Sequence, residues 1–206
     1  MRALVWEGPR RVMIREQAMP SPGPGEVLVR VAFAGICGSE LSAYLGHNAL
    51  RVPPLVMGHE FAGEVVALGD SARGHNPALR EGTQVTVNPL SSCGHCLYCQ
   101  RGDNHLCASR QLVGAHRAGG YAEYVVAPAT QALPLPEGMS LATGALTEPV
   151  AVAVRVGEMA GDLGGETTLV AGAGPIGLLV LQALQQRGAR RVFVSDLAPE
   201  RRAMAE

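Results

Sequence analysis

Residues 167–177 read Thr-Thr-Leu-Val-Ala-Gly-Ala-Gly-Pro-Ile-Gly, a short apolar run that leads directly into a G-x-G-x-x-G motif. An apolar run bounded in this way predicts a buried strand over residues 167–171. The aliphatic residues 176–186 predict a helix that ends at Gly188, and residues 191–195 predict a second buried strand. A strand, a helix and a strand of these lengths form a βαβ unit, so this part of the chain is predicted to be α/β.

The glycines of the motif indicate a dinucleotide-binding turn, because the motif follows a predicted strand and opens a predicted helix. Without side chains, Gly172, Gly174 and Gly177 let the backbone approach a pyrophosphate. The helix begins at Pro175 and Ile176, and its first N–H groups carry partial positive charge toward the same phosphates.

Asp196 ends the second predicted strand, at the distance from the glycines where such sites place an acid. Its carboxylate is expected to accept hydrogen bonds from a ribose 2′-OH and to repel a 2′-phosphate, which favours NAD over NADP. A basic group stands nearby and keeps NADP open as the alternative: Arg190, Arg191, Arg201 and Arg202.

The sequence before residue 133 has a different texture, with short β-rich runs separated by glycine and proline. The runs cover residues 3–6, 26–32, 62–68, 84–87 and 121–126. This spacing predicts a β-barrel or a sandwich-like domain. Residues 142–160 then predict a helix of small and aliphatic side chains. We therefore expect an α/β protein with a β-barrel, divided into residues 1–146 and residues 147–206.

Composition and charge exclude several classes of function. The net charge of −1 offers no basic surface for nucleic acid or an anionic membrane. All 17 basic residues are arginine, which excludes Schiff-base lysine chemistry and a P-loop lysine. The chain has neither a signal-peptide pattern at its start nor an apolar run long enough to span a bilayer, so a cytoplasmic location is expected.

Four of the five cysteines are crowded into the pattern C-x2-C-x2-C-x7-C. They are Cys93, Cys96, Cys99 and Cys107. In a reducing compartment, four closely spaced thiolates predict a tetrahedral zinc site with no open position, which serves structure and not catalysis. Free or pairing thiols and an iron–sulfur cluster are the alternatives. His95 and His105 lie between the cysteines, and we expect both to be solvent-facing loop residues.

A second set of possible metal ligands is dispersed along the chain and consists of Cys37, His59, Glu60 and Glu148. Taken singly, each has an ordinary structural interpretation as a buried thiol, a core histidine or a capping glutamate. Taken together, one thiol, one imidazole and one or two carboxylates match a catalytic zinc with a position for water or substrate.

These motifs resemble the zinc-containing alcohol dehydrogenases of the medium-chain dehydrogenase/reductase superfamily. Residues 58–63, Gly-His-Glu-Phe-Ala-Gly, together with Gly69, resemble the signature of that family, and the cysteine cluster resembles its structural zinc lobe. The pair Glu148-Pro149 resembles the polyol, threonine and butanediol dehydrogenase branch.

The resemblance implies a GroES-like barrel over residues 1–146, with a zinc lobe at about residues 88–110, and an incomplete Rossmann domain over residues 147–206. It implies two zinc ions per chain, with Cys37, His59 and Glu60 on the catalytic one and Glu148 as the fourth or exchangeable ligand. Ser39 would take the proton of a secondary alcohol whose hydride passes to NAD, and Arg201 would lie at the cofactor. Relatives are commonly dimers or tetramers, so a homo-oligomer is expected at full length.

The sequence also departs from the family pattern. Glu40 stands where relatives usually have aspartate, Ser42 and Arg155 stand where they often have histidine, and the surface residue His47 is the remaining candidate for passing on the proton. The chain ends as a new helix begins, which suggests part of a longer protein. A catalytically incompetent zinc-binding fragment is therefore the main alternative function; a zinc-free reductase and a nucleic-acid-binding zinc module are weaker ones.

Overall fold

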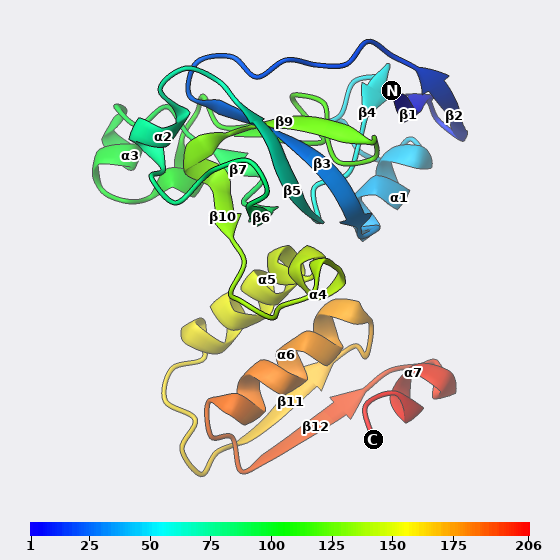
Figure 1. Cartoon of the computed structure of the whole chain (residues 1–206). Helices are drawn as coiled ribbons and strands as arrows, with labels where there is room; N and C mark the ends of the chain where they lie inside the picture. Colours follow the sequence, from blue (N-terminus) through cyan, green and yellow to red (C-terminus); the bar gives the residue numbers. More distant parts are fainter. The chain divides into compact units, whose positions relative to one another are not determined.

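The computed structural model describes residues 1–206, and the chain divides into two units, Met1–Leu146 and Thr147–Glu206 (Figure 1). The first unit is built mainly from strands, and the second from helices around a pair of strands.

The first unit contains a five-stranded antiparallel sheet in the order β10-β6-β5-β3-β9. Its strands are β3 (Glu26–Ala34), β5 (Phe61–Leu68), β6 (Gln84–Val87), β9 (Tyr124–Pro128) and β10 (Ala132–Pro134). A second sheet, in the order β2-β1-β4, consists of β1 (Arg2–Gly8), β2 (Arg11–Glu16) and β4 (Leu55–Val56). β7 (Leu90–Ser91) and β8 (Gln111–Leu112) pair separately at the base of the cysteine-rich lobe.

Short helices join these strands. They are α1 (Gly38–Tyr44), α2 (Ala72–His75), α3 (Leu97–Gln100) and α4 (Leu141–Ala145), with 3-10 turns η1 (Asn104–Leu106) and η2 (Ala129–Gln131). α4 begins where the Ser140 hydroxyl accepts a hydrogen bond from the backbone N–H of Thr143 at 3.1 Å, which caps the helix.

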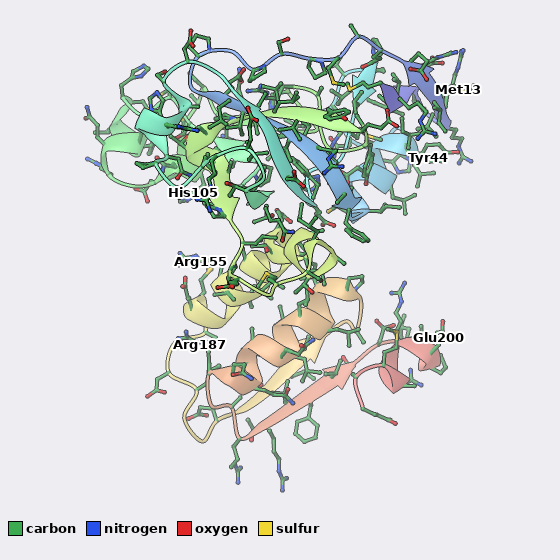
Figure 2. All side chains as sticks on the ribbon, in the orientation of Figure 1. Met13, Tyr44, His105, Arg155, Arg187 and Glu200 are labelled. Atoms are coloured by element: carbon green, nitrogen blue, oxygen red, sulfur yellow. The ribbon has the colours of Figure 1, made fainter.

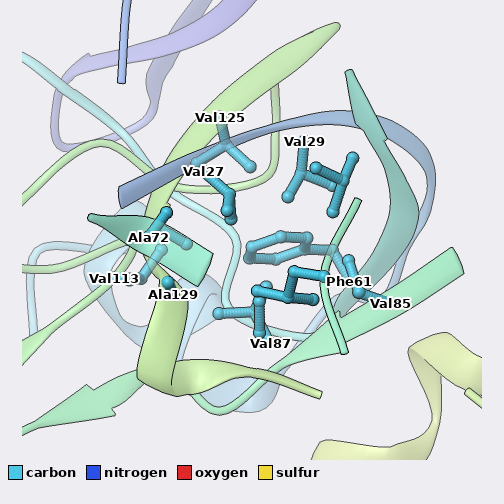
Figure 3. Close-up of a cluster of buried hydrophobic side chains, with 13 residues drawn as sticks. Val27, Val29, Phe61, Ala72, Val85, Val87, Val113, Val125 and Ala129 are labelled. Carbon is cyan, nitrogen blue, oxygen red and sulfur yellow. The ribbon is translucent and has the colours of Figure 1, made fainter. Parts of the chain in front are cut away.

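The core of the first unit lies around Phe61, the one aromatic side chain of its main cluster (Figure 3). Val27 and Val29 alternate along β3 so that both point inward, and Val85 and Val87 do the same along β6. The period of two in these apolar runs is what produces a sheet with one buried face, and apart from Phe61 the side chains of this core are aliphatic.

The two sheets are connected by a bridge between Ala3 and Ala122, next to which the N–H of Leu4 donates to the carbonyl of Tyr121 at 2.8 Å. The first unit is thus built from two sheets that are linked at this bridge, just before β9. Closure of these strands into a barrel stays a prediction from the sequence.

The second unit contains α5 (Thr147–Met159), β11 (Thr167–Ala171), α6 (Pro175–Gln186), β12 (Arg191–Ser195) and α7 (Pro199–Ala203). β11 and β12 pair in parallel in full register, and α6 connects them, so the predicted βαβ unit is confirmed. Ala153 of α5 and Val180 and Leu184 of α6 form its buried cluster with Leu163 and Val170. Charged side chains such as Arg155, Arg187 and Glu200 lie on its outside (Figure 2).

The single helix predicted over residues 142–160 is wrong, because the segment forms α4 and α5 with a break at Leu146. Pro149 supplies the physical reason. It has no N–H to continue an α-helical hydrogen-bond ladder from α4, and it is well accommodated in the first turn of a new helix.

Candidate metal centres and nucleotide loop

The pairing of β3 with β5 brings residues together that are distant in the sequence. Ala34, the last residue of β3, pairs with Phe61, the first residue of β5. Cys37 follows β3 after a short turn, and His59 and Glu60 directly precede β5. The antiparallel register therefore places all three possible ligands at one edge of the sheet.

Cys37, His59 and Glu60 each offer one ligand atom, and these atoms lie within 4.8 Å of one another. His59 and Glu60 are buried, with exposed fractions of 6% and 8%, and Cys37 is half-buried. Burying a thiol and a carboxylate this close together is unfavourable unless a cation compensates them. Thiolate, imidazole and carboxylate are zinc ligands, and three protein ligands leave a fourth position open. The donor set therefore fits a zinc ion of the catalytic type.

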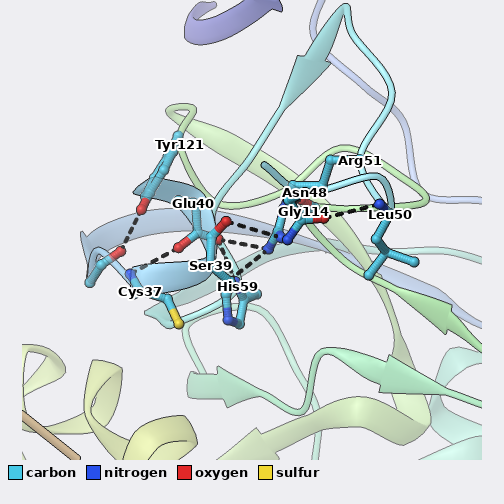
Figure 4. A network of polar contacts seen from close by, with 10 residues as sticks. Cys37, Ser39, Glu40, Asn48, Leu50, Arg51, His59, Gly114 and Tyr121 are labelled. Carbon is cyan, nitrogen blue, oxygen red and sulfur yellow. Dashed lines mark hydrogen bonds and ion pairs between the residues drawn. The ribbon is translucent and has the colours of Figure 1, made fainter. Parts of the chain in front are cut away.

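Glu40 connects two of these ligands through a single carboxylate (Figure 4). Its Oε2 accepts the backbone N–H of Cys37, the N-cap residue of α1, at 2.8 Å. Its Oε1 accepts a hydrogen bond from Nδ1 of His59 at 2.5 Å. A histidine that donates through Nδ1 has the tautomer in which Nε2 serves as the metal donor. The sequence identified Glu40 only as a departure from the family pattern, and this orienting contact was missed.

The environment of Glu40 keeps its carboxyl group ionised. Burial by itself would raise the pKa of Glu40, but the hydrogen bond and charge of His59, the N–H of Cys37 and the guanidinium of Arg51 hold that pKa below its usual range. Arg51 is itself buried, and its Nη2 lies 3.2 Å from Oε1 of Glu40.

Ser39, predicted to take the proton of an alcohol, is half-buried on α1. Its Oγ accepts a hydrogen bond from Nη2 of Arg51 at 3.1 Å (Figure 4). Ser42 is half-buried on the same helix, and His47 is exposed in the loop that follows, as the sequence predicted for a surface histidine. The contact with Arg51 was not foreseen.

Tyr121 and Gly35 form a support on the other side of these ligands. The hydroxyl of Tyr121 donates to the carbonyl of Gly35 at 2.9 Å, and burial followed by the nearby charges of Glu40 and Glu60 raises the pKa of this tyrosine above its ordinary value. A Cβ on Gly35 would lie 2.4 Å from Oε2 of Glu60, so the absence of a side chain at this position makes room for that carboxylate. Neither residue carries a sequence signal that predicts this role.

The four clustered cysteines meet in a separate lobe between β7 and β8. The sulfur atoms of Cys93, Cys96, Cys99 and Cys107 all lie within 4.8 Å of one another. Cys107 is buried and the other three are half-buried. His95 and His105 are exposed, as predicted, and neither belongs to the ligand cluster. Four sulfur donors with no other ligand match a closed, structural zinc site.

The thiols of this lobe do not ionise alike. The backbone N–H groups of His95 and Cys96 lower the pKa of Cys93 to about 6. For Cys96, the N–H of Cys99 lowers the pKa, but burial and the neighbouring sulfur atoms outweigh it and raise the pKa to about 11. Because successive thiolates in one cluster repel each other, full ionisation requires a cation among them.

The glycine-rich turn of the second unit is held to the end of β12 by Asp196. One carboxylate oxygen accepts the N–H of Ala173 and the other accepts the N–H of Ala198, both at 2.9 Å. These bonds, with the charges of Arg201 and Arg202, lower the pKa of Asp196. The predicted cofactor residues Gly172, Gly174, Pro175, Ile176 and Gly177 form the turn and the start of α6.

Close packing in this turn explains one of its glycines. A Cβ on Gly177 would lie 1.9 Å from the carbonyl oxygen of Gly172, so α6 approaches the turn more closely than any side chain permits. Nothing lies within 4 Å of a Cβ built on Gly174, which leaves open space at that position. This is the arrangement expected where a phosphate approaches the backbone.

Glu148, the remaining predicted ligand, lies in the first turn of α5 and is half-buried. It belongs to the second unit, whereas the other three ligands belong to the first. Its part in the metal site stays a prediction. None of the helices is both long enough and apolar enough to cross a membrane.

Comparison with known proteins identifies the family of the first unit. Residues 23–137 match the alcohol dehydrogenase GroES-like domain. The chain is 38% identical over 202 residues to the starvation-sensing protein RspB of Escherichia coli K12, a match that covers 98% of this chain and 58% of RspB. It is 38% identical over 210 residues to an L-threonine 3-dehydrogenase of Chelativorans, covering 100% of this chain and 60% of that enzyme. The chain thus spans about three fifths of the length of these relatives.

Solved structures give the same result. A short chain alcohol dehydrogenase (rspB) from E. coli CFT073, complexed with cofactor NADH, matches with a TM-score of 0.90 and 37% identity over 100% of this chain and 59% of its own. A zinc-binding dehydrogenase from Sinorhizobium meliloti bound to NADP matches with a TM-score of 0.91 and 36% identity, over 99% and 58%. The 2R,3R-butanediol dehydrogenase of Bacillus subtilis matches with a TM-score of 0.90 and 33% identity, over 99% and 60%.

Proposed function

Since the chain belongs to the zinc-type alcohol dehydrogenase family of medium-chain dehydrogenases/reductases, we propose that it is part of an NAD-dependent oxidoreductase. In this proposal it supplies the metal-binding residues and the glycine-rich turn that binds the nucleotide. Its relatives include threonine, polyol and butanediol dehydrogenases. The substrate would be a secondary alcohol of the polyol, threonine or diol type. The observation that carries the proposal is the meeting of Cys37, His59 and Glu60 within 4.8 Å at one sheet edge.

In this proposal each side chain has a defined task. Cys37, His59 and Glu60 hold a zinc ion, and Glu148 is the fourth or exchangeable ligand. The cysteine cluster holds a second zinc that stabilises its lobe. When bound, zinc supplies a Lewis acid for an alcohol oxygen, and NAD supplies a hydride acceptor.

Ser39 is the proposed proton acceptor, and its contacts restrict the route of the proton. A serine oxygen has two lone pairs and one proton. One lone pair accepts from Arg51, so the other is available for the alcohol proton. The proton that Ser39 then releases goes to an acceptor other than Arg51, because a guanidinium has donors only.

The nucleotide turn supports NAD as the cofactor. Asp196 places a carboxylate at the end of β12, where it would accept from a ribose 2′-OH and repel a 2′-phosphate. The neighbouring Arg201, with its guanidinium 3.8 Å from the carboxylate, would lie at the adenosine end of the cofactor. Isothermal titration with both cofactors tests the choice, and tighter binding of NADP would overturn it.

In the complete protein, we infer that the strands of the first unit close into a GroES-like barrel, that the second unit is part of a Rossmann domain, and that the subunits form a dimer or tetramer.

The second candidate function is a zinc-binding chain without catalysis. Two observations favour it. The chain spans about three fifths of the length of its relatives, and the parallel sheet of the second unit has only two strands.

Metal analysis and an enzyme assay separate these functions. The dehydrogenase proposal expects two zinc ions per chain, whereas a purely structural lobe expects one. NAD reduction would be measured with polyols, threonine and vicinal diols, on this chain and on the longest protein that contains it. Replacement of Cys37 by alanine is expected to abolish turnover and to spare cofactor binding. Turnover retained by that variant would contradict the assignment of the metal site.

A further inference from the structure

Arg51 is a buried cation in the loop between α1 and β4, and its guanidinium donates hydrogen bonds to segments around the candidate metal centre. Its side chain is 1% exposed. Nε donates to the carbonyl of Gly114 at 3.0 Å, and Nη1 donates to the carbonyl of Ser39 at 3.4 Å. A guanidinium remains charged when buried, so such a position is stable only where acceptors surround it.

The Nη2 group of Arg51 contacts two functional side chains at once. It lies 3.1 Å from Oγ of Ser39 and 3.2 Å from Oε1 of Glu40 (Figure 4). The same Oε1 accepts Nδ1 of His59, and the other oxygen of Glu40 accepts the N–H of Cys37. Arg51 therefore reaches two of the candidate zinc ligands through one carboxylate.

Glutamate has a flexible side chain, and without Arg51 the carboxylate of Glu40 would keep some rotational freedom between the ring of His59 and the N–H of Cys37. The planar guanidinium restricts this freedom, because it is fixed at the same time by the carbonyls of Gly114 and Ser39. Without Arg51, the carboxylate of Glu40 would be buried with its charge uncompensated on that side.

We propose that Arg51 is a positioning residue of the Cys37–His59–Glu60 site: it fixes the Glu40 carboxylate that orients His59 and the turn of Cys37, and it fixes Ser39 through the same guanidinium. The inference rests on the proposed use of this site as a metal centre. It adds an arginine that is not itself a candidate ligand but determines how the ligands are presented.

Cobalt binding to the metal-free chain provides the test, because Co²⁺ takes the ligands of zinc and its absorption reports each site separately. Both sites give d–d bands, but four thiolates give stronger charge-transfer bands and d–d bands at longer wavelength than a site with one thiolate. Loss of the weaker set in Cys37→Ser assigns it to the second site. Arg51→Met is expected to weaken that site by about 10–100-fold, as is typical of residues behind the ligands, and to shift its d–d bands.

The four-cysteine site acts as an internal control for folding, since its bands should be unchanged in Arg51→Met. Arg117→Met is the matched control, because Arg117 is a partly buried arginine of the same unit that pairs with Glu26 at 2.7 Å. It is expected to leave both cobalt sites intact.

If Arg51→Met also loses the four-cysteine bands, Arg51→Lys becomes the deciding variant. Lysine keeps the charge but not the fork of donors, so an intermediate loss at the second site supports the proposal and wild-type affinity overturns it.

A double-mutant cycle with Glu40→Gln distinguishes positioning from general stabilisation. If Arg51 acts through Glu40, adding Arg51→Met to Glu40→Gln weakens cobalt binding by less than about threefold, because the contact is already impaired. Fully additive losses overturn the proposal. Wild-type affinity and unchanged bands in Arg51→Met, with two cobalt ions bound by the parent chain, overturn it while the metal site stands. A parent chain that binds one cobalt overturns the proposed function and this inference together.

Discussion

The side chain of Glu40 uses its one carboxylate to contact the N–H of Cys37, the ring of His59 and the guanidinium of Arg51. Each of these contacts favours the ionised form. At this residue, stability and the orientation of the candidate metal ligands therefore depend on the same charge, and a change of pH tests both.

Glu40→Gln is expected to reduce the acid sensitivity of the metal-free chain. Because the folded-state pKa of Glu40 is lowered, its charge stabilises the fold above the unfolded-state pKa of about 4.3, and this contribution is lost as pH falls through the lower folded-state pKa. The wild type should thus be more stable than Glu40→Gln at pH 7, and the difference should shrink toward pH 3.

Urea unfolding at several pH values measures this difference. Glu64→Gln is the control, since Glu64 of β5 pairs with Arg30 of β3 on the surface of the five-stranded sheet. A gap between wild type and Glu40→Gln that stays constant from pH 7 to pH 3 would show that the charge of Glu40 does not stabilise the fold.

Gly35→Ala is expected to damage the second metal site selectively. The new Cβ would lie 2.4 Å from Oε2 of Glu60, so the carboxylate has to move. We expect the affinity for a second zinc ion to fall by about tenfold or more, as for other disturbances behind metal ligands. Gly38→Ala is the control, because nothing lies within 4 Å of a Cβ at that neighbouring position. Zinc content after dialysis measures the effect, and equal zinc retention by both variants would contradict the steric argument.

At the scale of elements, α6 and the turn before it separate two roles of glycine. Gly177→Ala places a Cβ 1.9 Å from the carbonyl oxygen of Gly172 and is expected to destabilise the second unit by about 1–3 kcal/mol, the usual cost of overpacking. Gly174→Ala has open space and a φ of −72°, so it should leave stability unchanged and instead obstruct a pyrophosphate.

Urea unfolding and NAD titration of the two variants check this separation. The expected pattern is a loss of stability in Gly177→Ala and a loss of NAD affinity at wild-type stability in Gly174→Ala. The opposite pattern would mean that the turn does not receive the phosphates.

Elements formed by residues close together in the sequence were predicted, whereas elements that depend on distant residues were missed. The apolar runs of β3, β5 and β6 and the βαβ unit were predicted, because periodicity and glycine placement are local signals. β2 was missed, since most of its side chains are exposed and its sequence lacks a buried face. α1 was also missed, because its start depends on Glu40 reaching back to Cys37, next to ligands contributed by another strand.

The candidate site followed the same rule. The four cysteines were identified from spacing alone, and Cys37, His59 and Glu60 were identified from family motifs. Arg51, Tyr121 and Gly35 were not, because their roles arise only when the antiparallel register brings three segments together. A lone arginine in a loop has the same sequence appearance whether it is buried or solvated.

At the scale of the whole molecule, the residues proposed as ligands of the catalytic metal belong to different units of the chain. The first unit contributes Cys37, His59 and Glu60, whose ligand atoms already meet within 4.8 Å. Glu148, the fourth ligand of the proposed function, belongs to the second unit, at the start of α5. If the three residues of the first unit suffice to retain a metal ion, Glu148 has a lesser part in binding.

Glu60→Gln and Glu148→Gln, each made in the 206-residue chain, show which of the two carboxylates contributes more to zinc affinity. Glu60→Gln replaces an anionic oxygen donor of a buried cluster with a neutral amide oxygen, and we expect the second site to lose zinc affinity by about tenfold or more. Glu148→Gln is expected to cost less than about threefold, as for a ligand that exchanges with water. Glu158→Gln, an exposed change on the same helix, controls for altered charge on α5. Competition with a chromogenic chelator measures all three. A larger loss in Glu148→Gln than in Glu60→Gln would reverse the assignment and make the metal site depend on the second unit.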